Sequence, residues 1–123
     1  MKLSILPNLP IPAYRQIYEQ ITSQILSGEL KSGDTLPPIR TVSRELGISV
    51  ITVRSAWEAL ERDGLIVSRA GSGCFIAELT HDSLAKRRLE TLDQALTSLV
   101  SDAKRLGFSA EELAELIKNK YEQ

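Results

Sequence analysis

The chain has 123 residues, of which 42% are hydrophobic, and its formal net charge is −1 at neutral pH. This length suits one domain, or a small domain with an appendage, and the hydrophobic content is sufficient for a modest core. No apolar run approaches the roughly 18 residues of a membrane span, and the apolar N-terminal stretch is too short for a signal peptide. The single cysteine, Cys74, excludes an internal disulfide framework, so we expect a cytoplasmic protein.

The first 28 residues predict an extended arm and then a helix. Prolines interrupt residues 1–11, and Pro12 suits a first helical turn, where a missing N–H costs nothing. Three isoleucines recur at every fourth position and predict a buried face: Ile17, Ile21 and Ile25. Gly28 ends this helix, and residues 28–37 are expected to form a structured loop.

Residues 39–63 predict two helices that are separated by a tight corner. Apolar residues at helical spacing give each helix one buried face: Ile39, Val42 and Leu46 in the first, and Val53, Ala56, Trp57 and Leu60 in the second. Gly47 ends the first helix, because glycine accepts the left-handed backbone of a sharp stop. Ser49 is a suitable N-cap for the second helix, and Gly64 follows its end. This arrangement is a helix-turn-helix.

Two short β-prone runs follow, Leu65–Ser68 and Cys74–Ala77. A glycine-containing connection, residues 69–73, joins them, which is typical of a hairpin. A helix-turn-helix followed directly by a hairpin is a winged helix. This architecture indicates DNA binding, because the second helix fits the major groove and the wing can lie on the backbone or in the minor groove.

The remaining sequence predicts two further helices. From about Ser83 to Leu106, apolar residues alternate at spacings of four and three, as in a heptad seam of about three repeats. Ser109 and Glu112 form a capping box, which starts a last helix that runs to about Tyr121. The seam could pack internally, or against the same seam of a second subunit. We favour the second subunit, with these interface residues: Leu89, Leu92, Leu96, Leu99, Leu106, Leu113 and Ile117.

The sequence therefore predicts a mainly α fold with one small β-hairpin. Residues 1–78 are expected to form a winged helix-turn-helix DNA-binding domain, and residues 79–123 a short helical dimerisation domain. A homodimer would place two recognition helices on successive half-sites, so we expect an inverted-repeat target.

Charge gives only weak support for DNA binding. Residues 31–73 carry six basic and five acidic side chains, so the segment is nearly neutral. Any basic surface must come from the arrangement of these charges and not from their sum.

Residues 14–77 resemble the GntR family of bacterial transcription regulators. The resemblance rests on a series of fixed spacings, which includes Leu36-Pro37, Leu46-Gly47-Ile48-Ser49, Thr52-Val53-Arg54, Gly64-Leu65-Ile66 and Gly71-Ser72-Gly73. The short C-terminal segment, with its two expected helices, is similar to the YtrA-type subfamily. That resemblance implies a dimerising tail, a repressor more than an activator, and regulation of transport operons.

Two positions depart from the family pattern. Val50 replaces an arginine that often follows the corner serine, and Pro38 replaces a serine after Leu36-Pro37. The first departure removes a charged DNA contact. Val50 or Ile51 could instead contact a thymine methyl group.

The candidate DNA-contacting residues lie in the two helices and in the wing: Arg40, Ser49, Val50, Ile51, Thr52, Arg54, Ser55, Arg69, Gly71 and Ser72. The resemblance gives Arg40 a phosphate or base contact, although it could be a solvated surface residue. Arg54 could bind guanine O6 and N7 or pair with Glu58. Ser49 could serve only as an N-cap, and Gly71 only as a turn glycine.

Other classes of function have less support. One histidine, His81, and one cysteine are too few for a metal site, and neither a catalytic constellation nor a nucleotide-binding loop is present. We therefore expect no metal, no cofactor and no enzymatic activity. A winged helix that docks a protein partner is the alternative, but the second helix lacks the exposed aromatic residues of such a face. A small-molecule effector is possible and is not indicated.

Overall fold

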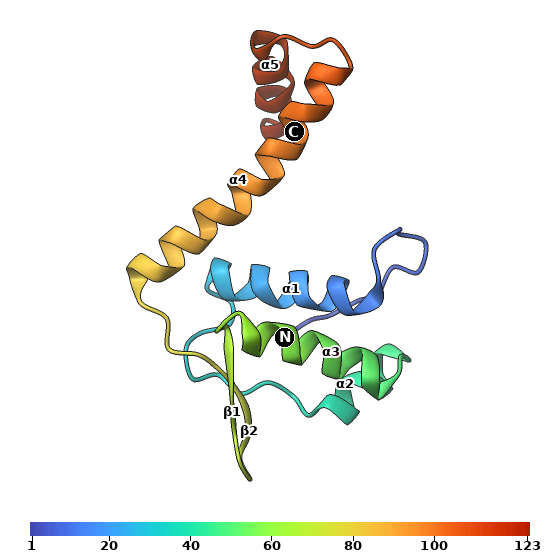
Figure 1. Ribbon diagram of the computed structural model, residues 1–123, viewed down its shortest axis with the longest axis vertical. Helices are drawn as coiled ribbons and strands as arrows, with labels where there is room; N and C mark the ends of the chain where they lie inside the picture. The colour runs from blue at the N-terminus through green and yellow to red at the C-terminus, as the bar shows by residue number, and fades with distance from the viewer. The chain divides into compact units, whose positions relative to one another are not determined.

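The computed structural model describes residues 1–123 (Figure 1). The elements in chain order are α1 (Ala13–Ser27), α2 (Ile39–Leu46), α3 (Val50–Arg62), β1 (Ile66–Arg69), β2 (Gly73–Ile76), α4 (His81–Arg105) and α5 (Ala110–Tyr121). The predicted fold class, mainly α with a small hairpin, is confirmed. The chain divides into two compact units, Met1–Leu84 and Ala85–Gln123. The expected boundary lies six residues earlier, and the functions of the two parts remain predictions.

The core of the first unit lies between α1, α3 and the base of the hairpin. The isoleucine face of α1 is buried. Helix α1 packs against α3, and Figure 1 shows the two helices side by side. From α3 the core receives Val53, Ala56, Trp57 and Leu60, and from the hairpin region Leu65, Ile66 and Ile76. These are the apolar positions whose helical spacing predicts burial, so the periodicity of the sequence determines this core.

The corner between α2 and α3 has the expected geometry. Gly47 adopts the left-handed conformation (φ 68°), and the Ile48 N–H donates to the Ser43 carbonyl over 3.1 Å. The Ser49 hydroxyl then accepts from the Thr52 N–H at 3.1 Å, which caps α3. The predicted N-cap is therefore confirmed, and the corner fixes the start of α3.

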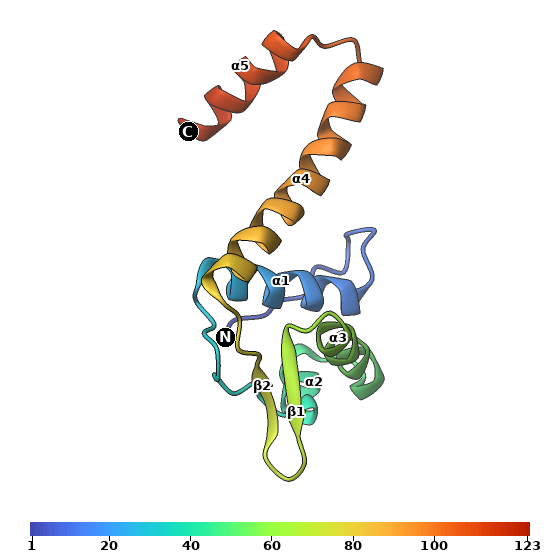
Figure 2. The same cartoon turned by 60° about the vertical axis from the view of Figure 1, so that its left-hand side comes forward.

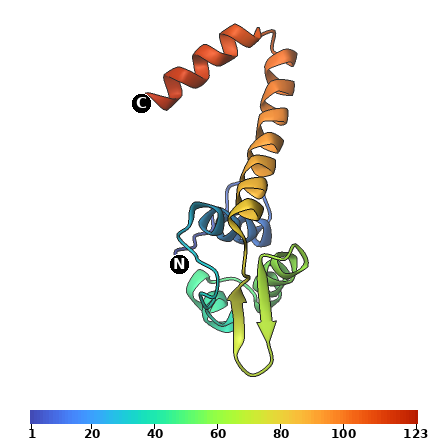
Figure 3. The same ribbon diagram turned by 90° about the vertical axis from the view of Figure 1, so that its left-hand side faces the viewer.

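The hairpin pairs β1 with β2 in antiparallel register, from Ile66 opposite Ile76 to Arg69 opposite Gly73. Both strands lie one residue nearer the tip than predicted. The reason is that the Leu65 N–H still bonds the Leu60 carbonyl at the end of α3, at 2.9 Å. Figures 2 and 3 show the hairpin projecting from the helical core on the side away from α1.

A third segment pairs with β2, in the region predicted only as a loop. Thr35 forms a β-bridge with Phe75. The Leu36 N–H donates to the Cys74 carbonyl at 2.9 Å, and the Ile76 N–H donates to the Asp34 carbonyl at 2.8 Å. The hairpin is thus attached to the segment that leads into α2, which fixes the wing relative to the helix-turn-helix.

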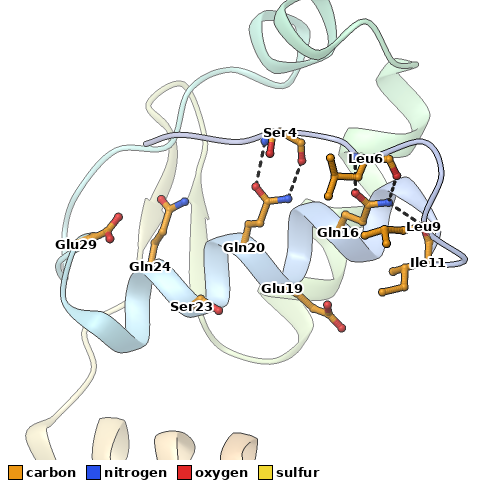
Figure 4. A pocket seen from close by; sticks show the side chains of 10 residues that line it. All are labelled: Ser4, Leu6, Leu9, Ile11, Gln16, Glu19, Gln20, Ser23, Gln24 and Glu29. Carbon is orange, nitrogen blue, oxygen red and sulfur yellow. Dashed lines mark hydrogen bonds between the residues drawn. The ribbon is translucent and has the colours of Figure 1, made fainter. Parts of the chain in front are cut away.

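The N-terminal arm lies along α1, where glutamine side chains bind its backbone (Figure 4). The three glutamines are four residues apart: Gln16, Gln20 and Gln24. Gln20 accepts from the Ser4 N–H at 3.0 Å and donates to the Ser4 carbonyl at 2.7 Å, and Gln24 donates to the Lys2 carbonyl at 2.7 Å. Four residues of a helix rise about 6.0 Å, and two residues of an extended chain span about 6.6 Å. Because these lengths are similar, glutamines four residues apart on α1 bond arm residues that are two apart.

The second unit contains most of α4 and all of α5, joined by a tight turn. Gly107 in this turn has φ 87°, and the Phe108 N–H bonds the Ala103 carbonyl at 2.9 Å. The predicted capping box is present: the Glu112 N–H bonds the Ser109 hydroxyl at 3.1 Å, and the Ser109 N–H bonds the Glu112 carboxylate at 2.9 Å. No helix is both long enough and apolar enough to cross a membrane.

Candidate nucleic-acid interface

The two sides of α3 differ in chemistry. One side is buried in the core, whereas Ile51, Arg54 and Glu58 are exposed on the other. Their spacing of three and four residues places them in one stripe along the helix. Val50, Thr52 and Ser55 beside this stripe are half-buried. Glu61 and Arg62 at the C-terminal end are also exposed, so α3 exposes one isoleucine, two arginines and two glutamates.

Hydroxyl groups at the start of α3 are hydrogen-bonded to each other and to the backbone. The Ser49 and Thr52 side-chain oxygens are 2.8 Å apart, and the Ser55 hydroxyl donates to the Ile51 carbonyl at 3.0 Å. Ser49 thus acts as the N-cap of α3, the structural role that the sequence offered as an alternative to DNA contact. A hydroxyl has one donor and two acceptor positions, so this role leaves room for a phosphate oxygen as well.

The arginines of the helix-turn-helix are free of ion pairs. Arg40 and Arg54 are exposed and form no salt bridge. The alternative in which Arg54 pairs with Glu58 is therefore absent from the structure. Arg44, one helical turn after Arg40, is also exposed. It is absent from the sequence-derived candidates, although its spacing of four residues from Arg40 places both on one side of α2.

The wing carries its candidates at the tip. The Arg69 guanidinium lies 5.2 Å from the centre of the Phe75 ring, which is the geometry of a cation–π contact. Gly71 has φ 75°, and the Ser72 N–H closes the turn on the Arg69 carbonyl at 3.0 Å. The positive φ shows that Gly71 is at least a turn glycine, because a residue with a Cβ would be strained there.

Most acids of residues 31–73 are engaged within the protein. Asp34 accepts from the Lys31 N–H at 2.8 Å, Glu61 accepts from the Ser68 N–H at 3.1 Å, and Asp63 accepts from the Tyr18 hydroxyl. Three of the five acidic groups thus have structural partners, while Arg40 and Arg54 face solvent. All five acidic side chains are nevertheless exposed, so these hydrogen bonds fix the positions of the acids and leave the segment close to neutral.

No group of three His, Cys, Asp or Glu side chains is placed to hold a metal ion. Cys74 is half-buried in β2, with its Sγ 3.4 Å from the Ser68 hydroxyl oxygen. His81 is exposed at the first residue of α4.

The candidate DNA-contacting residues come from α2, α3 and the hairpin of the first unit, and the predicted interface leucines all lie in the second. A capped helix that exposes an arginine, preceded by a short helix and followed by a wing, defines a winged helix-turn-helix DNA-binding protein. Residues 13–76 match the family model of the bacterial regulatory proteins of the gntR family. The chain belongs to the GntR family of transcriptional regulators.

Known proteins resemble the chain over different lengths. It is 33% identical to the HTH-type transcriptional repressor YtrA of Bacillus subtilis, across 94% of this chain and 89% of YtrA. It is 40% identical to the "Probable rhizopine catabolism regulatory protein MocR" of Rhizobium meliloti over 77 residues, but these cover 63% of this chain and only 16% of MocR. The likeness to YtrA therefore includes the C-terminal helices.

Solved structures show the same fold. A structure described as a transcriptional antiterminator from Listeria monocytogenes EGD-e has a TM-score of 0.79 and 29% identity, and it covers 100% of this chain and 91% of that one. The AraR DNA-binding domain in complex with operator ORX1 has a TM-score of 0.56 and 30% identity, covering 63% of this chain and 99% of that one.

Proposed function

We propose that the protein is a cytoplasmic, homodimeric transcriptional repressor that binds an inverted-repeat operator. The observation that carries this proposal is the combination of an unpaired Arg54 on the exposed face of α3 with an uncovered leucine seam on α4. The first feature supports base recognition, and the second supports pairing of two copies.

Base recognition is assigned to α3. An arginine that is free of internal partners can donate two parallel hydrogen bonds to guanine O6 and N7 in the major groove. Arg54 fulfils this condition, and it lies on the side of α3 that the core leaves open. The similar AraR DNA-binding domain, which has been solved in complex with operator ORX1, supports operator binding by this domain.

Backbone contacts are assigned to the flanking elements. Arg40 and Arg44 lie on α2, the helix that crosses the phosphate backbone in this class of motif. Arg69, Gly71 and Ser72 form the wing tip, where Gly71 lets the chain approach a sugar-phosphate strand closely. Such contacts orient the protein without reading sequence.

Dimerisation is assigned to the seam. Leu89, Leu92, Leu96 and Leu99 are 69%, 64%, 45% and 41% exposed. Leu106 and Ile117 are also exposed, and Leu113 is half-buried. Burial of a leucine contributes about 1.5–3 kcal/mol. These leucines are already partly covered, so each gains about half of this on pairing, and four from each subunit together contribute an amount comparable with the roughly 4–15 kcal/mol of freedom lost on association.

A two-fold dimer presents two identical recognition helices in opposite orientation, and this symmetry requires an inverted repeat. Repression of a transport operon is suggested by the names of relatives. YtrA is named a repressor, and a relative from Escherichia coli (strain K12), 43% identical over 67 residues, is named the mannosyl-D-glycerate transport/metabolism system repressor MngR.

The test is selection of bound duplexes from a random pool at about 0.15 M salt, because affinity for DNA depends steeply on ionic strength. We expect an inverted repeat whose half-sites are separated by about one helical turn. If the selected duplexes share no sequence motif and their binding is lost as the salt concentration rises, the proposal is contradicted. That outcome would favour the alternative, a winged helix that docks a protein partner.

A further inference from the structure

Ile51 is an apolar side chain that the fold does not use. It is 72% exposed, more than any other large hydrophobic residue of Met1–Leu84. It is absent from the hydrophobic core and from the half-buried residues packed around that core. Its neighbours Val53 and Ala56, by contrast, are fully buried. Folding alone therefore gives no reason for isoleucine at this position.

The position of Ile51 is the part of α3 that would approach base edges. It is the second residue of the helix, and recognition helices contact bases mainly through their N-terminal residues. The Ser55 hydroxyl donates to the Ile51 backbone carbonyl at 3.0 Å, so it is directed along the helix. It therefore does not cover the Ile51 side chain. Arg54 lies three residues further along the same stripe.

The floor of the major groove has one apolar group, the C5-methyl of thymine. An isoleucine cannot bond the exocyclic amine of cytosine or the oxygen of guanine, and a polar group covered without a partner is costly. A thymine methyl against Ile51 removes apolar surface from water on both sides of the contact. The chemistry of the exposed side chain therefore selects one base.

We propose that Ile51 is a specificity-determining residue that selects a T·A pair by contacting the thymine C5-methyl group. This inference rests on the proposed function, in which α3 enters the major groove. Between the two apolar candidates at this corner, the structure favours Ile51, since Val50 is half-buried. Three residues of helix rise about 4.5 Å and one base step about 3.4 Å. The thymine therefore lies within one or two base pairs of the guanine that Arg54 contacts.

The experiment replaces each thymine of the selected operator with deoxyuridine, which removes the methyl group and leaves the base pairing unchanged. We expect one position in each half-site at which the wild-type protein loses about fourfold in affinity, the value for one buried methyl group. Replacement in both half-sites should cost about 15-fold. Placing 5-methylcytosine opposite guanine at that position should restore part of the affinity lost on changing T·A to C·G.

Ile51→Ala identifies the residue responsible. This variant should fold normally, because the side chain is exposed, and it should bind the thymine and deoxyuridine operators equally. Ile51→Val should keep a reduced preference, and Leu9→Ala, at an exposed apolar residue of the N-terminal arm, serves as the control with an intact preference. Equal sensitivity of wild type and Ile51→Ala to deoxyuridine at every position would overturn the inference. Failure to select any operator would instead overturn the proposed function.

Discussion

The side-chain amide of Gln16 holds both backbone groups of Leu6. Its oxygen accepts the Leu6 N–H at 2.9 Å, and its nitrogen donates to the Leu6 carbonyl at 3.0 Å and to the Ile11 carbonyl at 2.9 Å. Gln16 is the one buried polar residue of the chain, and these bonds satisfy its amide. The Gln16 amide bonds the N–H and the carbonyl of the same arm residue, as a neighbouring β-strand would. The attachment of the arm to α1 therefore uses the arm's backbone and does not depend on its side chains.

Removing the middle glutamine should release the arm. Gln20→Ala deletes two hydrogen bonds to Ser4, each with a net contribution of about 0.5–1.5 kcal/mol. We expect faster hydrogen exchange of the amides of residues 4–6 and a free energy of unfolding lower by about 1–2 kcal/mol. Ser23→Ala, on an exposed position of the same helix, is the matched control. Unchanged exchange in Gln20→Ala would mean that the arm does not depend on these bonds.

Arg54→Ala should reduce specificity more than affinity for DNA in general. Loss of a bidentate guanine contact should cost about 1–3 kcal/mol on the selected operator and relax one base position. Binding to random DNA should change little. Titrations of both duplexes at one salt concentration measure the difference. Arg15→Ala removes the same charge from α1, where Arg15 pairs with Glu19 at 3.2 Å, and should leave the specificity ratio intact. An equal loss on both duplexes would exclude a base-reading role for Arg54.

Leu96→Glu should separate the subunits. A carboxylate at the middle of the seam would have to be buried without a partner, which costs several kcal/mol for each subunit. Sedimentation should show a monomer, and operator affinity should fall because each half-site is then bound independently. Gln94→Glu adds the same charge on the opposite side of α4 and should remain dimeric. A dimer of unchanged mass in Leu96→Glu would remove the seam from the interface.

Helix α5 should lose stability in acid through its capping box. Hydrogen bonds from the backbone N–H and then the side chain of Ser109 lower the pKa of Glu112 below its ordinary value. A carboxyl whose pKa is lower in the folded state contributes stability above its unfolded pKa, and this contribution is lost as the pH falls through the folded value. Circular dichroism should therefore show helix loss below about pH 4.3, the ordinary glutamate value.

Glu112→Gln is the control for this titration, because its amide oxygen can still accept the Ser109 N–H but carries no charge. The difference in acid sensitivity between the two proteins isolates Glu112 from the other carboxyl groups. Identical acid profiles would show that the box contributes no pH dependence.

Local sequence patterns specify much of this fold. Four-residue spacing gave the isoleucine face of α1, and glycines with Ser49 located the corner before α3. The Ser109 capping box depends on residues three apart and was predicted in full. Spacing of fixed residues was also sufficient to identify the family. These features are local because helix periodicity, caps and turns involve atoms within a few residues of each other.

Only the tertiary structure decided which distant segments meet. The attachment of the arm joins residues 16 positions apart at Gln20 and Ser4, and the bridge from Thr35 to Phe75 joins residues 40 apart. It also showed that Glu61 and Asp63 have partners within the protein, whereas Arg54 has none. The spacing of the glutamines does not predict the attachment of the arm. The nearly neutral charge sum does not predict which charged side chains have partners. The reason is physical: sequence periodicity specifies which face of an element is apolar, but hydrogen bonds between segments depend on where the folded core places their backbones.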